Sequence, residues 1–167
     1  MDQRVGIEQV SVSQLKDALQ QSFTEADEIV EEVEESSKLV RQATGTTEIT
    51  AALFRWEALR SDTFVRHWKV LRRVQEARDV YYNSLRGTMK KGPQGKDKFM
   101  AFEERKAVYE ATHIVDKTRL DILEQLEVDL KQLLTYLNNK IRWGEDMRRE
   151  FRKDIDREAF MSKKDYQ

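Results

Sequence analysis

The sequence predicts an all-α protein, an elongated helical hairpin with long amphipathic helices that assembles as a homo-oligomer. The chain has one proline and six glycines in 167 residues, and 37% of its residues are charged. Its apolar residues recur at three- and four-residue steps, and no run alternates as a strand would. These observations favour long helices over sheets.

Charge divides the chain into two predicted domains. Residues 1–35 hold ten acidic and two basic side chains, so the net charge of -1 leaves +7 for residues 36–167. We predict an acidic N-terminal helical arm over residues 1–46, and a basic helical hairpin with a C-terminal oligomerisation helix over residues 47–167. Cysteine is absent, and no stretch is apolar enough for a signal peptide or a membrane span. We therefore expect a soluble, cytoplasmic protein.

Two helices are expected in the acidic arm. The first runs from Val12 to Phe23 with Ser13 as its N-cap, and the second starts at Thr24 with acidic residues in its first turn. The further glutamates are interpreted as a solvated face, because no spacing resembles a calcium loop. Gly45 among threonines is expected to break the pattern, so that the next helix begins near Thr47.

One uninterrupted helix is expected after Thr47. Its packing stripe falls at alternating three- and four-residue steps: Ile49, Leu53, Trp56, Arg60, Thr63, His67, Val70, Val74, Ala77 and Tyr81. A neighbouring strip, also expected to pack, holds Leu59, Phe64, Trp68 and Leu71. Together they are wider than a two-stranded seam and indicate contact with more than one other helix.

A basic loop is expected from Arg86 to Lys98, because three glycines and the only proline lie there among lysines. The Walker spacing is absent, so no nucleotide-hydrolysing site is predicted. Helix is expected again from near Asp97 onward, weakened at Gly144. Its leucine heptad is interpreted as a packing face, either within the hairpin or as a seam between subunits. The residues assigned to oligomerisation are Leu123, Leu126, Leu130, Leu133, Leu137, Ile141, Trp143 and Phe151.

No catalytic constellation emerges from the sequence. His67 and His113 have no metal-ligand partner nearby, and the acidic residues lie on solvated helices. We therefore predict no enzyme activity, no cofactor, no metal and no small-molecule substrate. Cations beside flat rings instead favour binding of single-stranded DNA, whose phosphates attract charge and whose bases stack. The residues assigned to DNA are Arg66, Lys69, Arg72, Arg73, Arg78, Tyr81, Tyr82, Arg86, Lys90 and Lys91.

Two short motifs resemble the UvsY-type recombination mediators of T4-like bacteriophages. The first is Ala-Arg-Asp-Val-Tyr-Tyr at residues 77–82, followed by Arg-Gly at residues 86–87 and a polar loop. The second is Arg-Trp at residues 142–143, followed by Phe-Arg-Lys at residues 151–153. Arg78 matches a basic position before the tandem aromatic, whereas Glu76 stands where the family pattern prefers lysine.

The resemblance implies a non-enzymatic mediator for DNA recombination and DNA repair. Such a protein forms a ring-like homo-oligomer, binds single-stranded DNA and helps a recombinase replace the single-strand-binding protein. Its location would be the cytoplasm of an infected bacterial host. The alternative is a helical scaffold or adaptor that binds a protein partner or an anionic membrane surface, since basic amphipathic helices serve both uses.

Overall fold

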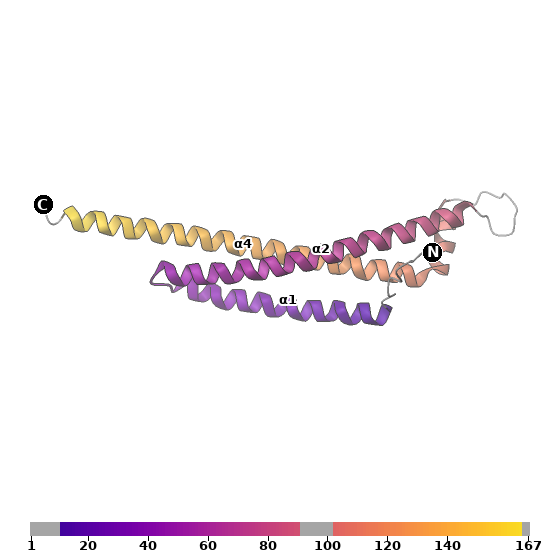
Figure 1. The fold of residues 1–167 in the computed structure, drawn as a ribbon, viewed down its shortest axis with the longest axis horizontal. Coiled ribbons are helices and arrows are strands. Elements are labelled where there is room, and N and C mark those ends of the chain that lie inside the picture. Colours follow the sequence, from indigo (N-terminus) through magenta and orange to yellow (C-terminus); the bar gives the residue numbers. More distant parts are fainter. Residues whose placement is uncertain (1–10, 91–101, 165–167) are drawn as a thin grey trace, which may run out of the picture. The chain divides into compact units, whose positions relative to one another are not determined.

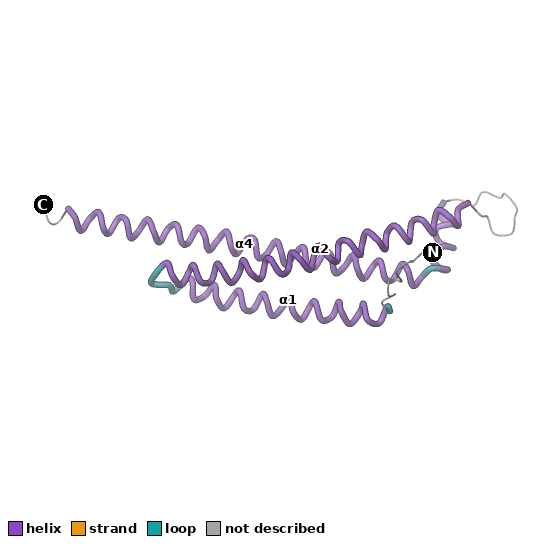
Figure 2. Tube along the Cα trace, in the orientation of Figure 1, coloured by secondary structure: helices purple, strands orange, loops and turns teal. Residues whose placement is uncertain are grey.

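The computed structural model describes residues 11–90 and 102–164, and these residues form helices joined by short connections (Figures 1 and 2). No strand occurs within this part of the chain, so the all-α prediction is confirmed. The hairpin arrangement and the homo-oligomer stay predictions. The helices are α1 (Val12–Arg41), α2 (Thr46–Lys90), α3 (Phe102–Thr112) and α4 (Ile114–Lys164).

Helix α1 is one helix rather than two. Ser11 caps it: its Oγ accepts from the Gln14 N–H at 3.2 Å, while the Ser11 N–H donates to Gln14 Oε1 at 2.8 Å. The predicted N-cap at Ser13 and the predicted start of a second helix at Thr24 are therefore wrong, because both residues lie inside the helix. The apolar face continues past Thr24 to fully buried Val33, so the helix has no reason to end there.

Helix α2 begins at Thr46, close to the predicted start. The Glu48 carboxylate accepts from the backbone N–H groups of Thr44 at 3.0 Å and Gly45 at 3.3 Å, which satisfies two donors before the first turn. The predicted loop start at Arg86 is wrong, because α2 continues to Lys90. A single glycine at position 87 costs only about 1 kcal/mol of helix propensity. The rest of that loop, and the helix start predicted near Asp97, lie outside the described residues.

A break between α3 and α4 was not predicted. His113 alone separates the two helices. Its N–H donates to the Tyr109 carbonyl at 2.8 Å, and its own carbonyl accepts from the Lys117 N–H at 3.1 Å, so backbone bonding bridges the break. Gly144, in contrast, lies within a continuous α4.

The chain divides into two compact units. Among the described residues, unit 1 comprises residues 11–22, 68–90 and 102–128, and unit 2 comprises residues 23–67 and 129–164. Each unit therefore takes residues from both predicted domains. Residues 23–41, the acidic part of α1, belong to unit 2 together with parts of α2 and α4.

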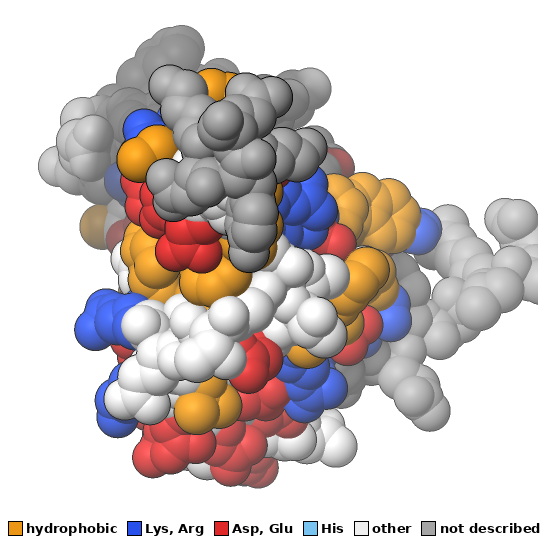
Figure 3. Space-filling view, turned by 90° about the vertical axis from the view of Figure 1, so that its left-hand side faces the viewer, with side chains coloured by type: hydrophobic (Ala, Val, Ile, Leu, Met, Phe, Trp, Pro, Cys, Tyr) orange, Lys and Arg blue, Asp and Glu red, His pale blue; other side chains and the backbone are white. Residues whose placement is uncertain are grey.

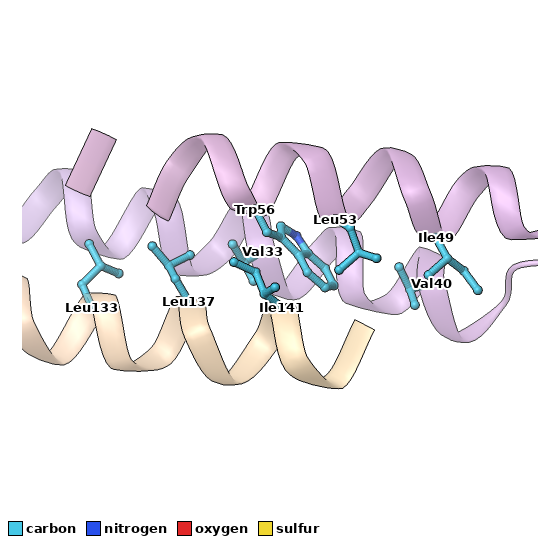
Figure 4. Packing of buried hydrophobic residues seen from close by; sticks show 8 residues of the cluster. All are labelled: Val33, Val40, Ile49, Leu53, Trp56, Leu133, Leu137 and Ile141. Atoms are coloured by element: carbon cyan, nitrogen blue, oxygen red, sulfur yellow. The ribbon is translucent and has the colours of Figure 1, made fainter. Parts of the chain in front are cut away.

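Unit 2 has a core built by three helices (Figure 4). Trp56 is fully buried at its centre, and its indole N–H donates to Ser36 Oγ at 2.8 Å. The core residues are Val33 and Val40 of α1, Ile49, Leu53 and Trp56 of α2, and Leu133, Leu137 and Ile141 of α4.

Gly144 allows α4 to approach α2 within unit 2. A Cβ atom at this position would lie 2.8 Å from both Leu53 Cδ2 and Trp56 Cζ3. The glycine interpreted from sequence as a weak point of the helix is therefore a packing residue. Its lower helix propensity is offset by the apolar contact that its missing side chain permits.

Unit 1 has its own core on the later half of α2. Tyr109 of α3 is fully buried, its ring lies edge-on to the Tyr81 ring at 5.3 Å, and its hydroxyl donates to the Tyr81 carbonyl at 3.1 Å. The buried apolar residues of this unit are Leu15 of α1, Val70, Val74, Tyr81 and Leu85 of α2, Tyr109 of α3, and Leu120, Ile122 and Leu123 of α4.

Candidate nucleic-acid interface

In unit 1, α2 buries one face and exposes the other. Val70 and Val74 lie one turn apart in the core, whereas Trp68, Leu71 and Tyr82 are 56%, 43% and 52% exposed. Trp68 was expected to pack, and this expectation is wrong, because in unit 1 the covering helices lie on the Val70 side. The outward face of α2 therefore offers two aromatic rings to solvent.

Exposed cations accompany these rings. Lys69, Arg72 and Arg73 are all exposed. Arg72 pairs with Glu76 one turn along the same helix, its Nε 3.1 Å from the carboxylate oxygen. In the part of the chain that the structure describes, Lys69 and Arg73 make no ion pair. We call Trp68, Lys69, Arg72, Arg73 and Tyr82 the α2 surface.

The tandem tyrosines face different surroundings, because consecutive helical residues point about 100° apart. Tyr81 is 6% exposed, and its hydroxyl donates to a Glu110 carboxylate oxygen at 3.3 Å. Burial, with the nearby Glu110 charge, raises the pKa of Tyr81 to about 12. Its assignment as a DNA-stacking residue is not compatible with this packing, whereas Tyr82 keeps an exposed ring.

Arg78 makes an ion pair within unit 1. Its Nε donates to Glu124 at 2.8 Å, and this hydrogen bond raises the pKa of Arg78 above its ordinary value. The bond joins α2 to α4 and uses the Nε–H of a guanidinium whose side chain is 44% exposed. We therefore treat Arg78 as a residue that positions α2.

The other predicted DNA contacts lie elsewhere. Arg66 belongs to unit 2, where it pairs with Glu25 of α1. Arg86 and Lys90 lie in the last turns of α2. Lys91 lies outside the described residues. Of the residues assigned to DNA, the α2 surface therefore retains Lys69, Arg72, Arg73 and Tyr82.

The residues assigned to oligomerisation are largely covered within one chain. Leu133, Leu137 and Ile141 belong to the unit 2 core, and Leu130 is also buried there. Leu123 is buried in unit 1, while Leu126, Trp143 and Phe151 are partly exposed. The fully covered leucines have little surface left for another copy, so an interface between copies needs other residues.

The acidic residues of α1 contact cations of the neighbouring helices in unit 2. Glu32 accepts from Arg55 Nε at 2.5 Å, and the other ion pairs join Glu25 to Arg66 and Glu34 to Lys140. In Figure 3, acidic side chains gather along the lower edge of the face shown. The exposed acidic residues of α1 that make no ion pair within the described chain are Asp17, Asp27, Glu28, Glu31 and Glu35.

A polar cluster that sequence reasoning missed lies between α1 and α4 in unit 2. Lys140 Nζ is 2.7 Å from a Glu34 carboxylate oxygen, which also accepts from the Tyr136 hydroxyl at 2.8 Å. These hydrogen bonds hold the pKa of Glu34 below its ordinary value, while burial raises the pKa of Tyr136. The one-turn spacing of Tyr136 and Lys140 is the only sequence signal for this cluster, because Glu34 is 102 residues away from Tyr136.

Glu34→Gln is expected to lower the melting temperature at neutral pH but not in acid. A carboxyl group whose folded pKa is lowered stabilises the fold above its unfolded pKa, and this contribution is lost as pH falls through the folded pKa. Thermal melts between pH 7 and pH 3 should therefore show the variant and the parent converging below pH 4.5, the ordinary pKa of the group. Glu35→Gln is the matched control, since Glu35 is exposed and makes no ion pair in the described chain. A constant difference across this range would contradict the ionic role.

Among the described residues, no group of three His, Asp or Glu side chains is arranged to hold a metal ion. No helix in the described ranges is both long and apolar enough to cross a membrane. Comparisons with protein-family models, curated proteins and solved structures found no match.

Proposed function

We propose that the chain is a single-stranded-DNA-binding recombination mediator without enzyme activity. It helps to load a recombinase onto single-stranded DNA covered by a single-strand-binding protein. The supporting observation is the α2 surface, where Trp68 is exposed next to Lys69 and Arg73, and Tyr82 is exposed farther along the same helix. The mediator role itself comes from the resemblance of residues 77–82 and the later motif to UvsY-type proteins.

The α2 surface suits a single strand better than a base-specific site. Ammonium and guanidinium groups attract phosphates of any sequence, and exposed rings stack on any base. Stacking contributes about 1–3 kcal/mol per base in single-strand binders. In one copy of the chain this site is weak, because it offers only two exposed rings and only two cations that make no ion pair in the described chain.

Weak sites become effective when copies are joined. A homo-oligomer presents several α2 surfaces to one strand, and the second contact then forms at a high effective concentration. The same arrangement allows local release, because each contact is individually weak. A protein that must hand the strand to a recombinase needs this combination.

The test is a salt titration with the double variant Lys69→Gln/Arg73→Gln. Each lost phosphate contact should shallow the slope of log affinity against log salt by roughly 0.7, hence about 1.4 for two, which corresponds to roughly 25-fold weaker binding of oligo(dT) at about 0.1 M salt. Light scattering on the same samples should give one oligomeric mass for variant and parent, above the 19.8 kDa of a single chain. Lys16→Gln/Lys131→Gln removes two exposed lysines outside the α2 surface and should leave the slope unchanged.

The same titration distinguishes the mediator hypothesis from the scaffold hypothesis. Duplex DNA and anionic vesicles are measured beside oligo(dT) at matched salt. Tighter binding to vesicles, or an unchanged oligo(dT) slope in a correctly assembled Lys69→Gln/Arg73→Gln variant, would contradict the proposal. A helical scaffold that binds a membrane or a protein would then be the better explanation.

A further inference from the structure

Trp143 of α4 is placed among cations in unit 2. The Arg41 guanidinium carbon lies 5.7 Å from the centre of the Trp143 ring, and Lys140 Nζ lies 5.8 Å from it. Both distances are within the range of cation–π attraction. Trp143 also packs on the core through Trp56, with ring centres 6.1 Å apart, so its indole is fixed in place while remaining partly exposed.

The two cations differ in what else they contact. Lys140 has an 18% exposed side chain and pairs with Glu34, so its charge is already balanced. Arg41 is exposed and makes no ion pair within the described chain, and its charge acts on Glu34 only through space, where it helps to lower the pKa of that carboxyl group. A guanidinium lying over an indole keeps its N–H groups available to an anion, and its planar fork matches the two oxygens of a phosphate.

Two further basic residues lie close to Arg41 and Trp143 in the sequence. Lys38 precedes Arg41 by one turn of α1, and Arg142 adjoins Trp143; both are exposed and without an ion pair in the described part of the chain. The next acidic side chains along α4 are Glu145, which makes no ion pair in the described chain, and Asp146, which pairs with Arg149 at 3.4 Å. Basic residues in the last turn of α1 also complement the helix dipole, but this effect does not account for Arg41 over the indole ring.

We infer that Arg41, Arg142 and Trp143 form a second contact site for single-stranded nucleic acid. Arg41 and Arg142 bind backbone phosphates, and the exposed part of the Trp143 ring contacts a base. This inference rests on the proposed function, because the second site would bind the same class of ligand as the α2 surface. It lies in unit 2 and uses other residues. Trp143 was assigned from sequence to oligomerisation, and its surroundings favour this additional role.

The three tryptophans allow the two sites to be read separately by fluorescence. Trp56 is fully buried and should not respond to DNA, Trp68 reports the α2 surface, and Trp143 reports the second site. In a Trp68→Phe protein, titration with oligo(dT) should therefore still change the fluorescence. Removing Trp143 as well, by Trp143→Phe, should abolish that change and leave only the constant Trp56 signal.

The decisive variant is Arg41→Gln/Arg142→Gln in the Trp68→Phe protein. We expect it to lose the DNA-dependent change of Trp143 and to shallow the salt slope by roughly 1.4, since two phosphate contacts are removed. Circular dichroism and light scattering confirm that the helices and the mass are retained. The matched control is Arg152→Gln/Arg157→Gln, which removes two exposed arginines farther along α4 and should preserve both signals.

The outcomes distinguish the second site from the proposed function. If oligo(dT) quenches Trp68 in the parent but leaves Trp143 unchanged, the second site is refuted while the α2 surface stands. If Trp143 responds equally in the Arg41→Gln/Arg142→Gln variant, its change is indirect and the inference also fails. If neither tryptophan responds and no binding is detected, the proposed function itself is refuted.

Discussion

Trp56→Ala is expected to lower the free energy of unfolding by about 3–5 kcal/mol, the range for removing a fully buried aromatic side chain. The Trp56 side chain is 0% exposed and belongs to the unit 2 core, and its indole N–H donates to Ser36 Oγ of α1. The substitution therefore leaves a cavity and removes the hydrogen bond that Ser36 Oγ accepts, while this hydroxyl keeps its bonds to the Glu32 and Val33 carbonyls. Urea unfolding followed by circular dichroism measures the change.

Trp68→Ala is the matched control for this prediction. It removes the same side chain from the same helix, but at a position that is 56% exposed, so we expect a loss below about 1 kcal/mol. Equal losses at both positions would show that the outward face of α2 is covered, for example by another copy of the chain. That result would also remove Trp68 from the α2 surface.

The buried face of α2 could be predicted from spacing alone. Seven positions of the expected packing stripe are buried: Ile49, Leu53, Trp56, Thr63, Val70, Val74 and Tyr81. Three- and four-residue steps identify these positions because they place side chains on one side of a helix. Arg60 is the exposed exception, since this regular spacing ignores whether a side chain is polar.

Which apolar strip is covered could not be predicted in the same way. Phe64 and Trp68 are as apolar as the buried stripe, yet both are more than half exposed. Covering a strip requires another helix, and the sequence of α2 carries no information about where α1 and α4 lie. The N-cap prediction for α1 failed for a different reason, because a local signal was overlooked: Ser11 and Gln14 have the Ser-x-x-Gln spacing of a capping box, whereas Ser13 is followed three residues later by Lys16.

The chemistry of the candidate site could be predicted from the sequence, but the particular residues that form it could be predicted less well. The basic and aromatic character of α2 is a property of composition, and Lys69, Arg73 and Tyr82 are exposed as expected. Arg66 and Arg78 are engaged by acidic residues 41 and 46 positions away in the chain. Such long-range ion pairs depend on the tertiary fold, so no local pattern separates a free arginine from a paired one.

Gly144→Val is expected to destabilise unit 2 by about 3 kcal/mol, the upper part of the usual range for overpacking a core. The first added carbon would already lie 2.8 Å from the Trp56 ring and 2.8 Å from Leu53 Cδ2. The Leu53 methyl can rotate away, but the Trp56 indole is a rigid ring that is fully buried, so it cannot swing out into solvent. Valine adds two further methyl groups to the same contact.

Alanine substitutions separate this steric effect from helix propensity. Gly→Ala inside a helix gains about 1 kcal/mol of propensity, so Gly144→Ala should show a smaller net loss than Gly144→Val. Gly45 is the matched control, because a Cβ there would meet nothing within 4 Å. Gly45→Ala should therefore be neutral or stabilising by up to about 1 kcal/mol, through a less flexible unfolded chain. If urea unfolding instead shows Gly144→Val to be as stable as the parent, then α4 does not pack on Trp56 and Leu53 at this point, and the fixed position of Trp143 beside Arg41 loses its support.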